Sequence, residues 1–181
     1  MANIEYSAII SYTSTMLSSP VSDASFYIDI CGVIDDECRH LQSLVSLLEA
    51  SGHAYPSFPV NSHILADLDR TSDCLRDRIA MISLVHEAKG LDAGDRLADK
   101  CRSMGCRETL AVVEMIVREE REHVRFGVKW FSRLCLEKKL DPKAEYMEFL
   151  KRRKVLLRPQ YMNFEAREAA NFPKDWIPIE K

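Results

Sequence analysis

The stretch Glu119-Glu120-Arg121-Glu122-His123 repeats a pattern that the chain also carries at Asp36-Glu37-Cys38-Arg39-His40. Both stretches read as an acid, a glutamate, two further residues and a histidine. In a helix, residues three positions apart lie on one face, about one turn from each other. The glutamate and the histidine of each stretch can therefore reach the same metal ion.

The residues around each stretch indicate which side of the helix faces the core. Small or apolar residues recur at spacings of three and four in two rows: Ile30, Ile34, Leu41, Leu44, Leu48 and Val113, Ile116, Gly127, Trp130, Leu134. Glu37 falls within the first row, and Glu120 and His123 fall within the second. Because a buried, unpaired carboxylate is costly, buried carboxylates usually pair with cations or bind metals.

Two lone glutamates precede these stretches at matching distances. Glu5 lies 32 residues before Glu37, and Glu87 lies 33 residues before Glu120. One glutamate from each of two helices, plus Glu-x-x-His from each of two others, is the pattern of di-iron and di-manganese carboxylate bundles. We therefore predict a site for two divalent ions, with iron as the first choice and manganese as the second. The predicted ligands are Glu5, Glu37, His40, Glu87, Glu120 and His123.

The acids that open the two stretches, Asp36 and Glu119, are interpreted as partners of the ligands or as solvated residues. A metal-free alternative explains the buried acids one at a time. In this alternative, both histidines are core residues with ordinary hydrogen-bond partners. Glu37, Glu87 and Glu120 pair with nearby arginines, which are Arg39, Arg76, Arg78 or Arg118. This alternative does not explain the shared order and offset of the acids.

Helical spacing extends through almost the whole chain, and no strand alternation is visible. It predicts long helices over residues 4–17, 23–50, 74–103 and 107–138 and shorter ones over 63–69 and 142–153. The segment Gly90-Leu91-Asp92-Ala93-Gly94 predicts a kink or break in the third long helix. The longest connection follows the second helix, so we expect an all-α, ferritin-like four-helix bundle with one long crossover. Residues 1–156 would form this bundle, and residues 157–181 an extended tail packed on it.

Composition limits the function classes. Acids outnumber bases by 28 to 25, giving a formal net charge of -3, which excludes a nucleic-acid binder that is basic over its whole surface. No stretch approaches the roughly 20 apolar residues that span a bilayer, and no secretory signal is visible, so no membrane association is expected. None of the six cysteines forms a Cys-x-x-Cys pair. We expect reduced thiols and a cytoplasmic location.

Other conspicuous residues have ordinary interpretations. His86 is interpreted as a core or surface histidine, and Trp130 as a core residue. Tyr6, Tyr12 and Tyr27 could lie near a site and take part in oxidative chemistry, but we interpret them as packing residues. The basic run Lys151-Arg152-Arg153-Lys154 could bind phosphate, but we interpret it as the solvated end of a helix.

Several stretches also resemble one family of ferritin-like proteins, known as domain of unknown function four-five-five. The resemblance covers nearly the whole chain and is most specific at Glu87-Ala88-Lys89-Gly90-Leu91-Asp92. It extends to residues 4–9, 36–40, 119–124, 127–131 and 163–167. It implies a ferritin-like fold and a dinuclear metal site at the six predicted ligands. The family commonly has a second acid in the first helix, where this chain has Ile10, and its members usually carry a longer N-terminal region.

These observations lead to one function and two alternatives. The leading hypothesis is a dioxygen-dependent oxidoreductase or hydroxylase in which Glu37 and Glu120 bridge two metals and His40 and His123 each bind one. Its partners would be dioxygen, a small-molecule or modified-base substrate and an electron donor, and we allow for a homodimer. The alternatives are a ferroxidase or metal-handling protein and a metal-free structural bundle. A pocket beside the metals favours the oxidoreductase, whereas a cage-like oligomer favours the ferroxidase or metal-handling protein.

Overall fold

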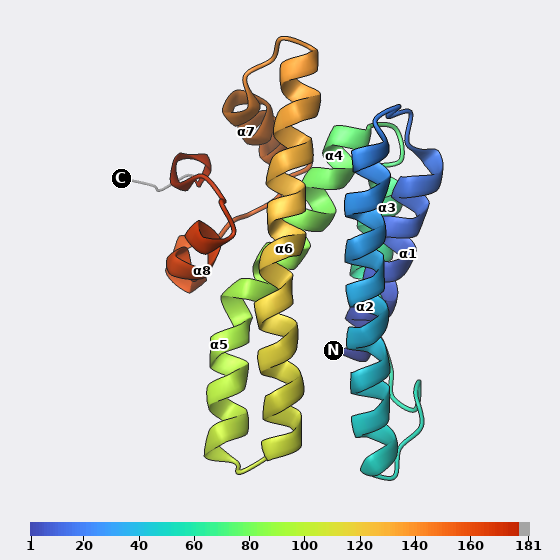
Figure 1. Ribbon diagram of the computed structural model, residues 1–181. Helices are drawn as coiled ribbons and strands as arrows, with labels where there is room; N and C mark the ends of the chain where they lie inside the picture. Colours follow the sequence, from blue (N-terminus) through green and yellow to red (C-terminus); the bar gives the residue numbers. More distant parts are fainter. Residues whose placement is uncertain (178–181) are drawn as a thin grey trace.

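A computed structural model describes residues 1–177, and within them the regular structure is helical throughout (Figure 1). Three long segments are α1 (Ala2–Ser18), α2 (Ala24–Ala50) and α6 (Arg107–Glu137). A fourth long segment consists of α4 (Leu75–Ile79), η1 (Ala80–Glu87) and α5 (Ala88–Ser103) in direct succession. Helix α1 packs along α2, α5 and η1 pack along α6, and α2 meets α6. The predicted all-α bundle is confirmed.

Local sequence signals fix the ends of several helices. The Asp23 carboxylate accepts a hydrogen bond from the Ser25 amide at the start of α2, as an N-cap residue does. Asp141 caps α7 (Pro142–Arg152) in the same way, with proline at the first position. Gly52 and Gly105 follow the ends of α2 and α5 with positive φ angles of 82° and 70°, a conformation that glycine adopts without strain.

The connection between α2 and α4 is the longest, as predicted, and it contains the short helix α3 (His63–Arg70). Helix α3 packs against α1 and η1, so the crossover places polar residues beside the middle of the bundle. Among the described residues, no helix combines the length and apolar character needed to cross a membrane. All six cysteines are free thiols.

The predicted break at residues 90–94 is wrong, because α5 runs through this segment without interruption. The irregular part of the helix lies earlier, in η1, a π-helix of 8 residues. Gly94 has a packing role instead: a Cβ atom at this position would lie 2.4 Å from Val117 Cγ2. The glycine lets α5 approach α6 closely, and the helix continues through it without a break.

The prediction of an extended tail is also wrong where the chain forms short helices. After residue 157 the chain forms η2 (Pro159–Tyr161), α8 (Phe164–Ala169) and η3 (Lys174–Trp176). Asn163 starts α8 by accepting a hydrogen bond from the Ala166 amide. Trp176 and Phe172 pack on Tyr146 of α7, with ring centroids 5.3 and 5.9 Å from it. The part of the predicted tail over residues 178–181 lies outside the described residues.

Candidate metal centre

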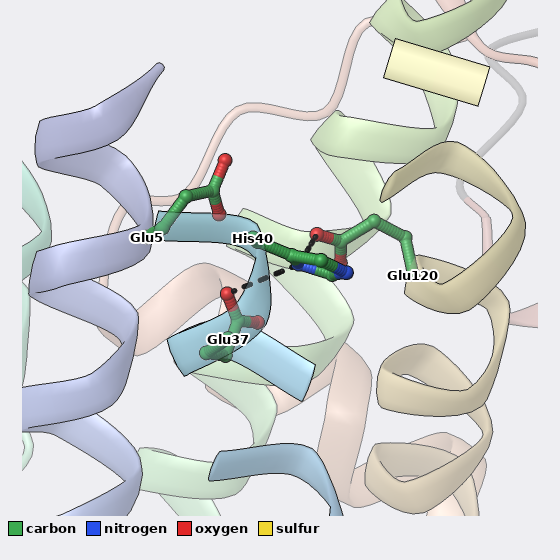
Figure 2. A group of neighbouring side chains, drawn as sticks. All are labelled: Glu5, Glu37, His40 and Glu120. Carbon is green, nitrogen blue, oxygen red and sulfur yellow. Dashed lines mark ion pairs between the residues drawn. The ribbon is translucent and has the colours of Figure 1, made fainter. Parts of the chain in front are cut away.

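The six predicted ligands come together in the middle of the bundle (Figure 2 labels four of them). Glu5 lies on α1, Glu37 and His40 on α2, Glu87 at the end of η1, and Glu120 and His123 on α6. All six are buried; Glu37, His40 and His123 have no exposed surface. Six polar groups from four segments therefore face one another with little or no contact with bulk solvent.

Their ligand atoms form two groups that share two carboxylates. One group is Glu5, Glu37, His40 and Glu120, and the other is Glu37, Glu87, Glu120 and His123. Within each group, one oxygen or nitrogen from every residue lies within 4.8 Å of the others. Each group could hold one metal ion, and Glu37 and Glu120 lie where both ions could use them. The predicted roles of the six residues as ligands stay predictions.

The inner nitrogens of both imidazoles face these carboxylates. His123 Nδ1 lies 2.9 Å from Glu37 Oε1 and 3.1 Å from Glu120 Oε2. His40 Nδ1 lies 3.6 Å from Glu37 Oε2 and 3.9 Å from Glu120 Oε1, as the dashed lines of Figure 2 mark. The two Nδ1 atoms thus point at the shared carboxylates from opposite helices.

The outer nitrogens contact the acid of the opposite stretch. His40 Nε2 on α2 lies 3.0 Å from Glu119 Oε2 on α6. His123 Nε2 on α6 lies 3.4 Å from Asp36 Oδ2 on α2. The Arg39 guanidinium forms ion pairs with both Asp36 and Glu119 and joins them at the surface. Histidines that ligate metals almost always have such a carboxylate or carbonyl on the other ring nitrogen.

The chemistry of the inner groups fits metal ions better than it fits ion pairing. Neither Glu37 oxygen has a hydrogen-bond partner of good geometry, and neither has His40 Nδ1, although all three atoms are buried. Unpaired buried polar atoms are rare and call for a missing partner. The four arginines of the metal-free alternative bind elsewhere: Arg39 and Arg118 to Glu119, Arg76 to Glu145 and Arg78 to Ser18. Within the described residues, none of them pairs with Glu37, Glu87 or Glu120.

The protonation of the centre reflects the crowding of its acids. Burial, together with the charges of Glu37 and Glu120, raises the pKa of Glu5 from 4.5 to about 9. Burial and the charges of Glu120 and Glu37 likewise raise the pKa of Glu87 well above its usual range. Burial opposes ionisation of both Glu37 and His123, but the groups that face them prevail. The contacts with His123 and His40 lower the pKa of Glu37, and the charge of Glu120, with the hydrogen bond to Asp36, raises the pKa of His123. Without a metal, the acids of the centre therefore share protons.

The π-helix η1 positions Glu87 and was not predicted. A π-turn is wider than an α-turn, and such segments occur frequently at functional sites. Ser83 of η1 accepts or donates a hydrogen bond with Tyr12, at 2.8 Å between the two hydroxyl oxygens. Tyr12 is buried and packs with its ring edge towards His123, at 6.5 Å between centroids. Tyr12 is thus buried beside a predicted ligand, and Trp130 is buried in the core, as predicted.

A cavity of about 490 Å³ opens beside the centre. Three of the predicted ligands line it: Glu5, Glu87 and Glu120. Helix α3 contributes Asp67, whose Oδ2 lies 3.0 Å from His86 Nε2. Neither this pair nor the cavity was predicted, because both depend on where the crossover lies in space. His86 lines the cavity and belongs to neither group of ligand atoms, as expected from its position next to Glu87.

Comparisons with known proteins give a family but no activity. The model of the family described as "Protein of unknown function (DUF455)" matches residues 1–178. A protein of Haemophilus influenzae, described as uncharacterized, is 26% identical over 156 residues, which cover 84% of this chain. The chain spans about half the length of that relative, 54%. No solved structure matches.

Proposed function

The chain belongs to the DUF455 family, and from this premise we propose that it is a dinuclear metal enzyme that uses dioxygen to oxidise or hydroxylate an organic substrate. Iron is the first choice of metal and manganese the second, because hard carboxylate oxygens and imidazole nitrogens suit both. Bound at Glu5, Glu37, His40, Glu87, Glu120 and His123, the two ions would supply the redox chemistry with dioxygen. The substrate would occupy the adjacent cavity.

The observation that carries this proposal is the cavity beside the two groups of ligands. A protein that only oxidises or stores iron needs a path for ions, whereas an enzyme for organic molecules needs a pocket at its reactive centre. The cavity reaches Glu5, Glu87 and Glu120 directly. Its contact with both groups of ligands supports substrate oxidation over metal handling.

The surrounding residues would hold the ligands in place and keep water out. Asp36 and Glu119 would accept hydrogen bonds from the Nε2–H groups of His123 and His40, which leaves each Nδ1 lone pair directed inwards. Because Glu37 and Glu120 lie between the two imidazoles, they would serve both ions. Tyr12 packs against Phe126, with ring centroids 5.9 Å apart, and lies beside His123, so this apolar packing would help to keep water out.

Metal analysis of the purified protein tests the centre. After anaerobic loading with ferrous or manganous ions and removal of excess metal, we expect two ions per chain. The Glu120→Ala variant should retain fewer than one, because both groups lose a shared carboxylate. Glu122→Ala, an exposed position on the same helix that pairs with Arg125, is the matched control. No bound metal in the wild type, or full metal in Glu120→Ala, would overturn the proposal.

A second measurement separates the enzyme from a ferroxidase. With excess ferrous ion and dioxygen, a ferroxidase oxidises many ions per chain, while the proposed enzyme oxidises only those bound at its centre. We therefore expect oxidation to stop near two ions per chain. Continued oxidation with growth of a ferric product would support the metal-handling alternative instead.

A further inference from the structure

The walls of the cavity beside the centre are largely apolar. Helices α5 and α6 contribute one side, and α1 and α3 contribute the other; the apolar residues are Ile4, Ile64, Ala93, Leu97, Ile116 and Val117. At about 490 Å³, the cavity falls in the range of roughly 300–1,000 Å³ that is usual for small-molecule sites. A highly polar molecule such as a sugar would leave most of its hydroxyl groups unpaired against these walls.

The charged groups of the cavity are distributed unevenly. Asp67 is already paired, with His86 at 3.0 Å and with Arg70 at 3.1 Å. Glu5, Glu87 and Glu120 belong to the centre, where protons or metal ions would offset their charge. Lys89 lines the cavity from an exposed position on α5. Among the described residues it forms no ion pair, unlike Lys129, Lys143 and Lys174.

From this distribution we propose that the cavity binds an organic anion, with its apolar body between α5, α6 and the α1–α3 side and its negative group at Lys89. The inference rests on the proposed function and adds the class of substrate to it. A lysine ammonium is a flexible point charge, so it selects an anion without fixing its geometry. A cationic substrate would meet an uncompensated positive charge at this wall. Carboxylate, sulfonate and phosphate groups share the required chemistry.

Two fluorescent probes of similar shape test the charge requirement. 8-Anilinonaphthalene-1-sulfonate carries an anionic group on an apolar body, and N-phenyl-1-naphthylamine is its uncharged relative. We expect Lys89→Gln to weaken binding of the anionic probe about tenfold, since the variant loses a hydrogen bond to a charged group that is partly screened by solvent. Binding of the uncharged probe should stay within about twofold. Lys100→Gln, on the same helix and outside the cavity, is the matched control.

A second substitution tests whether the probes occupy this cavity. Ala93 lies on the exposed side of α5 and lines the cavity, so Ala93→Trp should fill it and weaken both probes. Lys100→Trp should weaken neither. If Ala93→Trp does not fold, as judged by circular dichroism, Ala93→Leu replaces it. Unchanged binding in the filled variant, or equal changes of both probes in Lys89→Gln, would overturn the proposal.

These measurements separate failure of this inference from failure of the proposed function. Probe binding is measured by titration of both the metal-free and the metal-loaded full chain, and it requires no turnover. A protein that binds the anionic probe through Lys89 but retains no metal would contradict only the function. A protein that retains two ions but binds both probes independently of Lys89 would contradict only the substrate class.

Discussion

Glu119 and Asp36 contact the centre only through the histidine of the opposite helix. Removing such an outer partner of a metal-ligating histidine usually lowers metal affinity or activity roughly 10–100-fold. For Glu119→Gln, which keeps the shape but loses the charge that faces His40 Nε2 at 3.0 Å, we expect a loss of metal affinity in this range. Competition with a chromophoric chelator measures it.

The control for this substitution is Glu122→Gln on the same helix, whose carboxylate faces solvent and pairs with Arg125. Its metal affinity should equal that of the wild type. Equal affinities in Glu119→Gln and the wild type would show that the contact with His40 does not position a ligand.

Glu5 also gives the metal-free protein a specific pH dependence. The pKa of Glu5 is raised from 4.5 to about 9 in the folded protein. The folded protein therefore keeps a proton that the unfolded chain releases above about pH 4.5. Stability is therefore lost as the pH rises through this window, with a slope of up to about 1.4 kcal/mol per pH unit for each such group. We expect urea denaturation in the presence of a chelator to give a lower free energy of unfolding near pH 9 than near pH 6.

The Glu5→Gln variant should show a smaller loss over the same interval, because the amide does not ionise. The raised pKa values of Glu87 and His123 act with the same sign, so part of the slope remains in this variant. A wild type whose stability is flat or rises between these pH values would contradict the assignment.

The sequence predicts which six residues come together and offers Asp36 and Glu119 as their partners, but it does not predict which histidine each acid contacts. Spacing along one helix places Glu120 and His123 on the same face, and this holds wherever the helix lies. The contact of Asp36 with His123, rather than with His40 of its own helix, depends on how far α2 and α6 are rotated towards each other. No residue spacing within one helix contains that information.

At the scale of helices, Gly127 controls how closely α6 approaches η1. A Cβ atom there would lie 2.4 Å from Ser83 Cβ and 3.0 Å from Leu84 Cδ2. Gly127→Ala should therefore push η1 outwards and destabilise the protein by about 1–3 kcal/mol, as overpacking of a core does. Since Glu87 is the last residue of η1, metal affinity should fall as well. Thermal unfolding and chelator competition measure both effects.

Gly32→Ala on α2 is the matched control, because a Cβ atom at that position meets no other atom within 4 Å. Helix propensity alone predicts a stabilisation of up to about 1 kcal/mol there. If Gly127→Ala behaved like Gly32→Ala, the close contact between α6 and η1 would have no energetic importance.

The third helical segment marks the limit of prediction at this scale. Glycines at positions 90 and 94 have low helix propensity, and this favoured a break where α5 is continuous. The actual irregularity, η1, consists of residues that are ordinary in a helix, such as Leu84 and Val85. Its contacts with Tyr12 and α6 come from distant parts of the sequence, so no local pattern indicates them.

At the scale of the whole molecule, a largely buried ion pair joins the C-terminal segment to the bundle. The Arg167 guanidinium donates two hydrogen bonds to Asp92 on α5, at 2.8 and 2.7 Å, and stacks over Phe172. Breaking a buried pair by removing one partner costs about 3–5 kcal/mol. We expect Asp92→Asn to release the segment after residue 157, so that limited proteolysis cleaves it faster than in the wild type.

The exposed pair of Lys143 and Asp175 connects the same two parts of the molecule. Exposed pairs contribute at most about 1 kcal/mol, so Lys143→Gln should leave the cleavage rate nearly unchanged. Equal cleavage of both variants would mean that the aromatic contacts of Trp176 hold the segment without help from Arg167. The tail was predicted as extended because its prolines outweighed the short helical pattern of residues 164–169 in the sequence.

The eight residues of the centre and its outer acids divide equally between two parts of the chain. Residues 5–40 supply four of them and residues 87–123 supply the other four, while the intervening crossover includes the exposed loop 56–63. Ions bound there would therefore act as a cross-link that closes a long loop, and such links lower the chain entropy of the unfolded state. The centre would stabilise the fold as well as carry out the reaction. Loading it would slow unfolding, and emptying it would expose the protein to proteolysis in the cell.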